Sequence, residues 1–115
     1  MGLTTDRNSP CLKVIEENGQ QACYLILSEE ERAKGFIRPV RRTYKHIACG
    51  GITTMGQAIA ETYARDPKFY GGTYCVLCGK HFNLIDWDSD GNLIRQFAWI
   101  ENPGSGREDG TYVGE

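Results

Sequence analysis

The 115-residue chain has little that would tie it to a membrane or to secretion. Its longest apolar run, Ala22 to Leu27, is far shorter than the roughly 20 residues that span a bilayer. The N-terminus has no basic segment followed by an apolar core. Asp6 stands where a myristoylation signal requires Ser or Thr. We therefore expect a cytoplasmic protein that uses no membrane.

An excess of positive charge is also missing. The chain has 13 Lys and Arg against 15 Asp and Glu, so its net charge of −2 gives no global reason to bind nucleic acid. Hydrophobic residues make up 40% and charged residues 24%, which is typical of a globular protein and excludes disorder of the whole chain. We predict a flexible lead-in at 1–10, a single domain at 11–101 and a flexible tail at 102–115.

Two turn signals predict β-hairpins. Asn18-Gly19 and Asp90-Gly91 each lie between apolar stretches, and such dipeptides favour tight turns because their residues accept positive φ. The predicted strand pairs are 12–16 with 21–27, and 82–87 with 93–100. The second turn begins like a calcium loop at Asp86, but Phe97 occupies the position that requires a bidentate Glu. We interpret it as a turn.

Between the hairpins, the sequence predicts two helices and one strand. Ser28 begins a capping box with Glu31 and predicts a short helix. Thr54 does the same for the main helix, which Pro67 ends. The apolar stripe of that helix comprises Met55, Ala58, Ile59, Thr62 and Tyr63. Alternation over 37–47 predicts a strand that ends near His46. The sequence thus predicts a small, single α+β domain with two β-hairpins and one main helix.

Both histidines and three of the five cysteines fall into a metal-ligand pattern. It reads His46-x2-Cys49-Gly50 and later Cys75-x2-Cys78-Gly79-x-His81. Each half places two soft ligands three residues apart, with a glycine that lets the backbone turn. We predict one structural zinc-ribbon-like site in which His46, Cys49, Cys75 and Cys78 bind Zn²⁺, with His81 as the alternative fourth ligand.

Cysteines at these spacings also serve other chemistry. A redox pair should open a helix, whereas a strand-like segment follows Cys78; an iron–sulfur site is a further alternative. A zinc hydrolase or deaminase-like enzyme would need an acid, for which Glu61 is the candidate, but Gly51 and Tyr74 replace the deaminase Glu and Pro. Cys11 and Cys23 remain. We expect them to be reduced and partly buried, with a disulfide or a reactive thiol as the alternatives.

Basic and aromatic side chains cluster along the predicted strand 38–46. The candidate partner-binding residues are Arg38, Arg41, Arg42, Tyr44, Lys45 and, beyond the strand, the aromatic Tyr70. Such a face could contact an acidic protein or track phosphates. We expect a protein partner, keep a nucleic-acid binder as the alternative, and expect no small-molecule substrate.

The two half-sites resemble those of zinc ribbons and related zinc fingers over residues 46–82. A longer set of segments is similar to small proteins encoded by bacteriophages and prophages: Arg41-Arg42-Thr43-Tyr44-Lys45-His46, Thr54-Met55-Gly56, Ala60 to Arg65, Phe69-Tyr70-Gly71 and Cys75-x2-Cys78-x2-His81-Phe82. This resemblance implies a non-enzymatic accessory protein that acts on a bacterial host protein inside the host cell, such as an inhibitor of a defence or nucleic-acid-processing system. In that group Cys-x2-Cys-x2-His-Phe forms a unit, which implies His81 as a ligand.

Overall fold

The computed structural model, which describes residues 2–100 and 107–115, is built around a four-stranded antiparallel sheet in the order β10-β9-β3-β4. These strands are β3 (Thr43–His46), β4 (Ile52–Thr54), β9 (Phe97–Ile100) and β10 (Glu108–Tyr112). Residues 1 and 101–106, which include the end of the predicted domain and the start of the predicted tail, lie outside the described residues. The predicted α+β class is confirmed.

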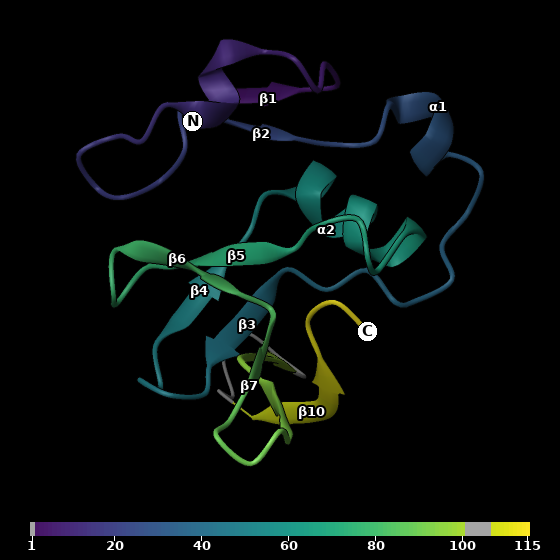
Figure 1. Cartoon of the computed structure of the whole chain (residues 1–115). Coiled ribbons are helices and arrows are strands. Elements are labelled where there is room, and N and C mark those ends of the chain that lie inside the picture. Colours follow the sequence, from purple (N-terminus) through teal and green to yellow (C-terminus); the bar gives the residue numbers. More distant parts are fainter. Residues whose placement is uncertain (1, 101–106) are drawn as a thin grey trace.

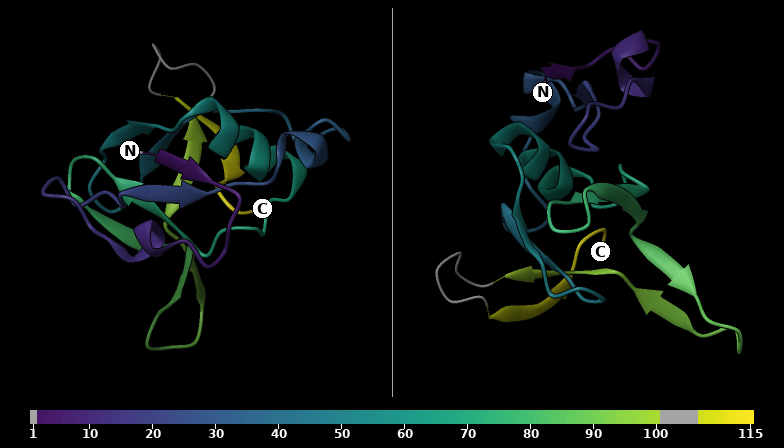
Figure 2. Two further views of the ribbon diagram at one scale, coloured as in Figure 1. Left: turned by 90° about the horizontal axis from the view of Figure 1, so that it is seen from above. Right: turned by 90° about the vertical axis from the view of Figure 1, so that its left-hand side faces the viewer.

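Over the described residues, three two-stranded sheets and three short helices complete the fold. The strand pairs are β1 (Gly2–Thr4) with β2 (Cys23–Leu25), β5 (Gly72–Cys75) with β6 (Lys80–Asn83), and β7 (Ile85–Trp87) with β8 (Leu93–Arg95). The helices are a 3₁₀ turn (Pro10–Lys13), α1 (Glu29–Arg32) and α2 (Gln57–Arg65). Figure 1 shows β1 and β2 as a layer on one side of α2, with β3 and β4 on the other. The β7–β8 hairpin projects away from this stack (Figure 2).

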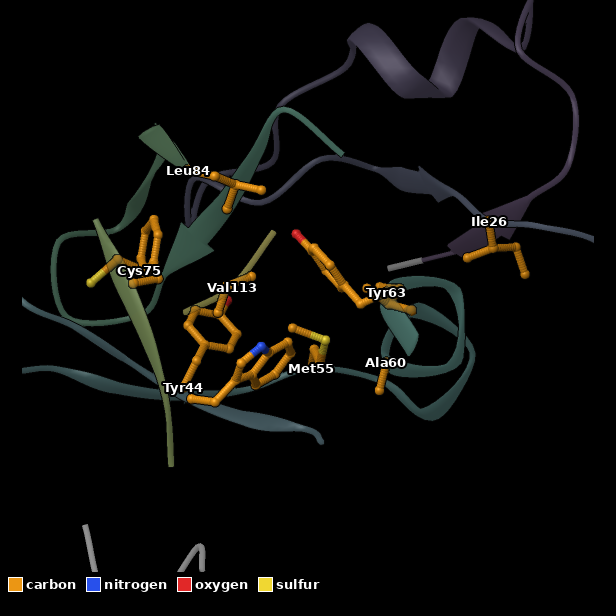
Figure 3. Packing of buried hydrophobic residues seen from close by; sticks show 11 residues of the cluster. Ile26, Tyr44, Met55, Ala60, Tyr63, Cys75, Leu84 and Val113 are labelled. Atoms are coloured by element: carbon orange, nitrogen blue, oxygen red, sulfur yellow. The ribbon is translucent and has the colours of Figure 1, made fainter. Parts of the chain in front are cut away.

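The core lies where α2 meets the central sheet (Figure 3). Trp99 and Tyr44 are fully buried, and their rings meet edge to face at 6.2 Å. Tyr63 of α2 packs edge to face against the same Trp99 at 5.8 Å. Ile59 and Thr62 are also buried on α2, so most of the predicted stripe faces inward. Aromatic edge-to-face packing therefore joins the helix to the sheet.

The predicted N-terminal cap is present at α1 and absent at α2. Ser28 Oγ accepts a hydrogen bond from the Glu31 amide at 3.2 Å, as predicted for α1. The predicted cap at Thr54 is wrong, because Thr54 ends β4, where its hydroxyl lies 3.1 Å from that of Thr43. The helix α2 starts after Gly56 without a side-chain cap. In the described part of the chain no helix is long and apolar enough to cross a membrane.

The predicted turn at 88–92 is confirmed. Asp88 Oδ1 accepts hydrogen bonds from the amides of Asp90 and Asn92 at 2.9 and 2.8 Å, and Gly91 has φ of +82°. The hairpin is shorter than predicted, since 97–100 leave it as β9 for the central sheet. The carboxylate of Asp88 is thus used inside the turn, as expected of a turn rather than a calcium loop.

The turn at Asn18-Gly19 forms, but the predicted hairpin around it does not extend. Gly19 has φ of +88°, and the Glu16 amide donates to the Gln20 carbonyl at 2.7 Å. Beyond it only an isolated bridge joins Ile15 to Gln21. The start of the predicted first strand, 12–16, lies in the 3₁₀ turn at 10–13. The predicted second strand contains β2, which pairs in parallel with β1 and not with 12–16.

Both predicted flexible ends contain ordered strands. Within the predicted lead-in, β1 pairs with β2, and the Gly2 amide donates to the Ala22 carbonyl at 2.8 Å. Within the predicted tail, β10 pairs with β9, and Val113 is buried with its amide 3.0 Å from the Phe97 carbonyl. Pairing satisfies the backbone groups along β9, which explains why residues 108–113 join the sheet.

Cys11 and Cys23 form a disulfide with a Cα–Cα distance of 5.4 Å, so the expectation of two reduced thiols is wrong. The 3₁₀ turn carries Cys11 back over β2, whose first residue is Cys23. The bond fastens the 3₁₀ turn to the β1–β2 pair. This part of the chain therefore holds together as one N-terminal layer, defined here as residues 2–27.

Replacing both Cys11 and Cys23 by serine should lower the free energy of unfolding by about 3 kcal/mol. The bond joins residues separated by 12 positions, and closing a loop of that length restricts the unfolded chain by roughly this amount. Urea unfolding without reductant measures the difference. A phosphine reductant should bring the wild type down to the variant and leave the variant unchanged; equal stability without reductant would contradict the expectation.

Candidate metal centre

Two hairpin turns bring four potential ligands to one point. His46 ends β3, and Cys49 lies in the turn to β4. Cys75 ends β5, and Cys78 lies in the turn to β6. One ligand atom from each of these residues falls in a group whose members all lie within 4.8 Å of one another, so the group could hold a metal ion.

The two turns have matching backbone geometry. Gly50 and Gly79 have φ of +77° and +69°, which favours glycine strongly over other residues. The Gly50 amide donates to the His46 carbonyl at 2.7 Å, and the Gly79 amide donates to the Cys75 carbonyl at 2.8 Å. Each glycine thus closes the turn that carries two ligands, the role that the sequence pattern predicted for it.

The separations between the ligand atoms fit a four-coordinate ion. His46 Nδ1 lies 3.2 Å from Cys49 Sγ and 3.7 Å from Cys78 Sγ. Cys49 Sγ lies 3.5 Å from Cys75 Sγ. A tetrahedral ion with bonds of about 2.3 Å to sulfur and about 2.0 Å to nitrogen sets ligand atoms about 3.5 to 3.8 Å apart. The four side chains are therefore spaced as one shell.

A chain of polar contacts orients the His46 ring. Its Nε2 lies 3.2 Å from Gln96 Oε1, and Gln96 Nε2 donates in turn to Asp86 Oδ2 at 2.7 Å. Phe82 and Phe97 flank the imidazole, with ring centroids 4.4 and 4.8 Å away. A proton held on Nε2 leaves the Nδ1 lone pair for a metal. The sequence reasoning missed Gln96, whose position 50 residues from His46 carries no local signal.

Hydrogen bonding favours a thiolate at Cys49. Desolvation raises the pKa of this thiol, but a hydrogen bond from the Gly51 amide, 3.3 Å from Sγ, and contacts with Cys75, Cys78 and His46 lower the pKa to about 7. Desolvation and the neighbouring Cys49 and Cys75 raise the pKa of Cys78 to about 11. Three thiolates crowd together unfavourably without a cation, so the group favours a bound positive charge.

His81, the alternative ligand, lies outside this group. Its Nε2 is 2.9 Å from the Tyr24 hydroxyl, across the boundary with the N-terminal layer. Desolvation lowers the pKa of His81, which keeps the ring neutral. In the structure, His46 therefore lies beside the three cysteines, whereas His81 contacts Tyr24.

The aromatic residues predicted to contact a partner serve the interior instead. Tyr44 is only 2% exposed, and its hydroxyl donates to the Tyr74 carbonyl, so its predicted place on a contact surface is wrong. Tyr70 is half-buried, and its hydroxyl donates to the Leu25 carbonyl. The sequence pattern did not show that β3 is a central strand of the sheet.

Acidic groups near the C-terminus face the predicted basic strand. Arg41 Nη1 lies 3.2 Å from Asp109 Oδ2, and its guanidinium lies 4.8 Å from the centre of the Trp99 ring. Lys45 Nζ lies 3.7 Å from Glu108 Oε2. The remaining two arginines donate to backbone carbonyls, Arg38 to that of Glu115 and Arg42 to that of Met55. Much of the positive charge is therefore balanced within the chain.

Comparisons of this chain with protein-family models, curated proteins and solved structures found no match. The resemblances to zinc ribbons and to phage proteins therefore stay expectations. Any function has to be derived from the geometry and chemistry of the site.

Replacing Gln96 by leucine should weaken Zn²⁺ binding about 10–100-fold, because the His46 ring loses the acceptor that fixes its orientation. Competition with a chromophoric chelator measures the affinity, and circular dichroism checks that the fold persists. Gln57→Leu is the matched control, since Gln57 is an exposed glutamine that contacts Glu61 on the same helix. Unchanged affinity in the Gln96 variant would refute a role for this residue.

Proposed function

We propose that His46, Cys49, Cys75 and Cys78 hold a structural Zn²⁺ and that the protein is a non-enzymatic binding module. Three sulfur donors and one imidazole nitrogen suit the borderline-soft character of zinc. Four protein ligands complete a tetrahedral shell, whereas catalytic zinc keeps a position for water or substrate. The ion would join the β3–β4 turn to the β5–β6 turn.

The groups that an enzyme would need are engaged elsewhere. Glu61, the acid considered for zinc catalysis, forms an ion pair with Arg32 at 2.6 Å and accepts a hydrogen bond from Gln57 at 2.9 Å. His81 contacts Tyr24. Neither belongs to the group of candidate ligands. These contacts favour a structural role for the ion over hydrolysis or deamination.

The observation that carries the binding function is an apolar patch on the two ligand turns. The residues between the ligands, Ile47 and Ala48 in one turn and Val76 and Leu77 in the other, are all exposed. Leu77 is 65% exposed. A Cβ at Gly51 would lie 2.6 Å from that of Leu77, so the two turns touch. We name these four residues the turn patch; exposed apolar patches mark sites of protein contact.

A turn patch held rigid by a metal ion suits a binding module, because a rigid surface loses little entropy on binding. The glycine turns and the ion would fix the four apolar side chains in one arrangement, so little backbone entropy is lost when a partner covers them. The resemblance to phage proteins supplies the kind of partner. We propose that the partner is a protein of a bacterial host and that binding takes place in the host cytoplasm. The bound protein would inhibit a defence or nucleic-acid-processing system.

Nucleic-acid binding through the strand 38–46 remains the rival function. The ion pairs of Arg41 with Asp109 and of Lys45 with Glu108 weigh against it, because they neutralise charges that phosphates would need. Binding to DNA or RNA that weakens steeply with salt and is lost in an Arg41→Ala/Arg42→Ala variant would favour the rival over the proposed module.

Replacing Leu77 by glutamate should reduce capture of the host partner at least about tenfold, because a carboxylate buried in an apolar contact is costly. The wild type and the variant would be used as baits in a bacterial lysate, and the captured protein would then be tested in pure form. Ile37→Glu is the control, since Ile37 is 59% exposed but lies beside the end of α2. Both baits should carry equal zinc. If the Leu77 variant binds the partner as tightly as the wild type does, the turn patch is not part of the contact.

Purified protein should carry one Zn²⁺ per chain and release it as the pH falls. Zinc binds thiolates, so binding expels the thiol protons. Because the pKa of Cys78 is raised to about 11, at least one proton leaves with each ion bound, and affinity should fall at least about tenfold per pH unit below neutrality. Elemental analysis and competition titrations at about pH 6 and pH 8 measure this. Absence of metal, or an affinity independent of pH, would contradict the zinc site.

A further inference from the structure

A cavity of about 290 Å³ lies between the N-terminal layer and the rest of the domain. Leu12 and Leu25 line it from the layer, and Met55, which precedes α2, and Ile59 on α2 line it from the rest of the domain. This volume is close to the lower end of the range for small-molecule sites, about 300–1,000 Å³.

The lining of the cavity is aromatic and uncharged. Five tyrosines line it, namely Tyr24, Tyr44, Tyr63, Tyr70 and Tyr74, together with Thr53, Thr54 and Thr73 and the glutamines Gln20 and Gln21. Among the residues that the structure describes, no Asp, Glu, Lys or Arg lines it. A charged ligand would lose its hydration there without gaining an opposite charge. Aromatic walls favour a planar ring, and the hydroxyl and amide groups of the lining favour a ligand with a hydrogen-bonding edge.

Hydrogen bonds from tyrosines join the two walls and fix the spacing between them. Tyr70 donates across the gap to the Leu25 carbonyl, and Tyr74 donates to the Asn18 carbonyl. The Tyr24 hydroxyl meets His81 at 2.9 Å. Desolvation raises the pKa of Tyr70 and of Tyr63, so these hydroxyls stay neutral donors and acceptors. With the disulfide fixing the layer, the cavity is formed before any ligand arrives.

We propose that this cavity binds an uncharged, planar ring compound that carries an amide-like hydrogen-bonding edge. Such a site goes beyond the proposed zinc-stabilised binding module. It does not use the metal ligands, since none of the four lines the cavity. The ligand would stack among tyrosine rings and exchange hydrogen bonds with the threonine and glutamine side chains that line the walls.

Four one-ring probes separate charge, shape and polarity in a titration of the full chain followed by amide chemical shifts. Benzamide has the planar ring and the neutral polar edge, benzoate and benzamidinium add a charge of either sign, and toluene lacks the edge. Benzamide should shift the amides of cavity residues such as Gly56, Gly72 and Thr73 in a saturable way. The two charged probes should bind at least tenfold more weakly, and toluene more weakly than benzamide. Equal binding of benzoate, or benzamide shifts confined to other surfaces, would overturn the proposal.

Two variants fill the cavity from opposite walls. Ile59→Trp enlarges a side chain on α2, and Leu25→Trp does so on β2. The affinity of each folded variant for benzamide should fall at least tenfold. One folded variant is enough for the test, so if one of the two does not fold, the other decides the outcome. Gln57→Trp is the control, because Gln57 is exposed on α2 and does not line the cavity. Wild-type affinity in a folded cavity-filling variant, or an equal loss in the control, would refute the site.

Discussion

The meeting of His46 with three cysteines is the constraint on which the centre of the fold depends. The strand β3 belongs to the central sheet, whereas β5 belongs to a separate two-stranded sheet, and the ligand turns at their ends bring the two together. The intervening chain, including α2, forms a loop that this meeting closes. Three thiols within 4.8 Å of one another repel when ionised, so a bound cation would make the closed loop favourable.

Ion pairs neutralise part of the positive charge of the basic strand. The strand β10 supplies Asp109 and Glu108, which lie opposite Arg41 and Lys45. The acidic residues of β10 are thus the counterpart of part of the basic cluster. Since the ligand turns carry exposed apolar residues and none of these charges, the turn patch is a better candidate for a contact surface than the basic strand.

Features that depend on a few neighbouring residues could be predicted from the sequence. The Ser28 cap, the Asp88 turn, the glycine turns and the ligand spacing each have a local signature that the structure contains. Features that depend on distant partners could not. The parallel pairing of β1 with β2, the addition of β10, the disulfide and the Gln96 contact all join segments whose meeting no short pattern encodes. The cap expected at Thr54 failed for a similar reason, because pairing with Thr43 keeps it in a strand.

The N-terminal layer and the metal centre are mechanically connected, and the connection runs through one close approach. A Cβ at Gly19 would overlap the Gly79 carbonyl oxygen, so the tip of the Asn18-Gly19 turn rests directly on the second ligand turn. Tyr74, next to the ligand Cys75, holds the same tip through the Asn18 carbonyl. A change in the ligand turn therefore reaches the layer and the cavity beneath it. Because an equilibrium coupling between two sites is reciprocal, a change in the layer, which the disulfide constrains, reaches the candidate metal centre to the same extent.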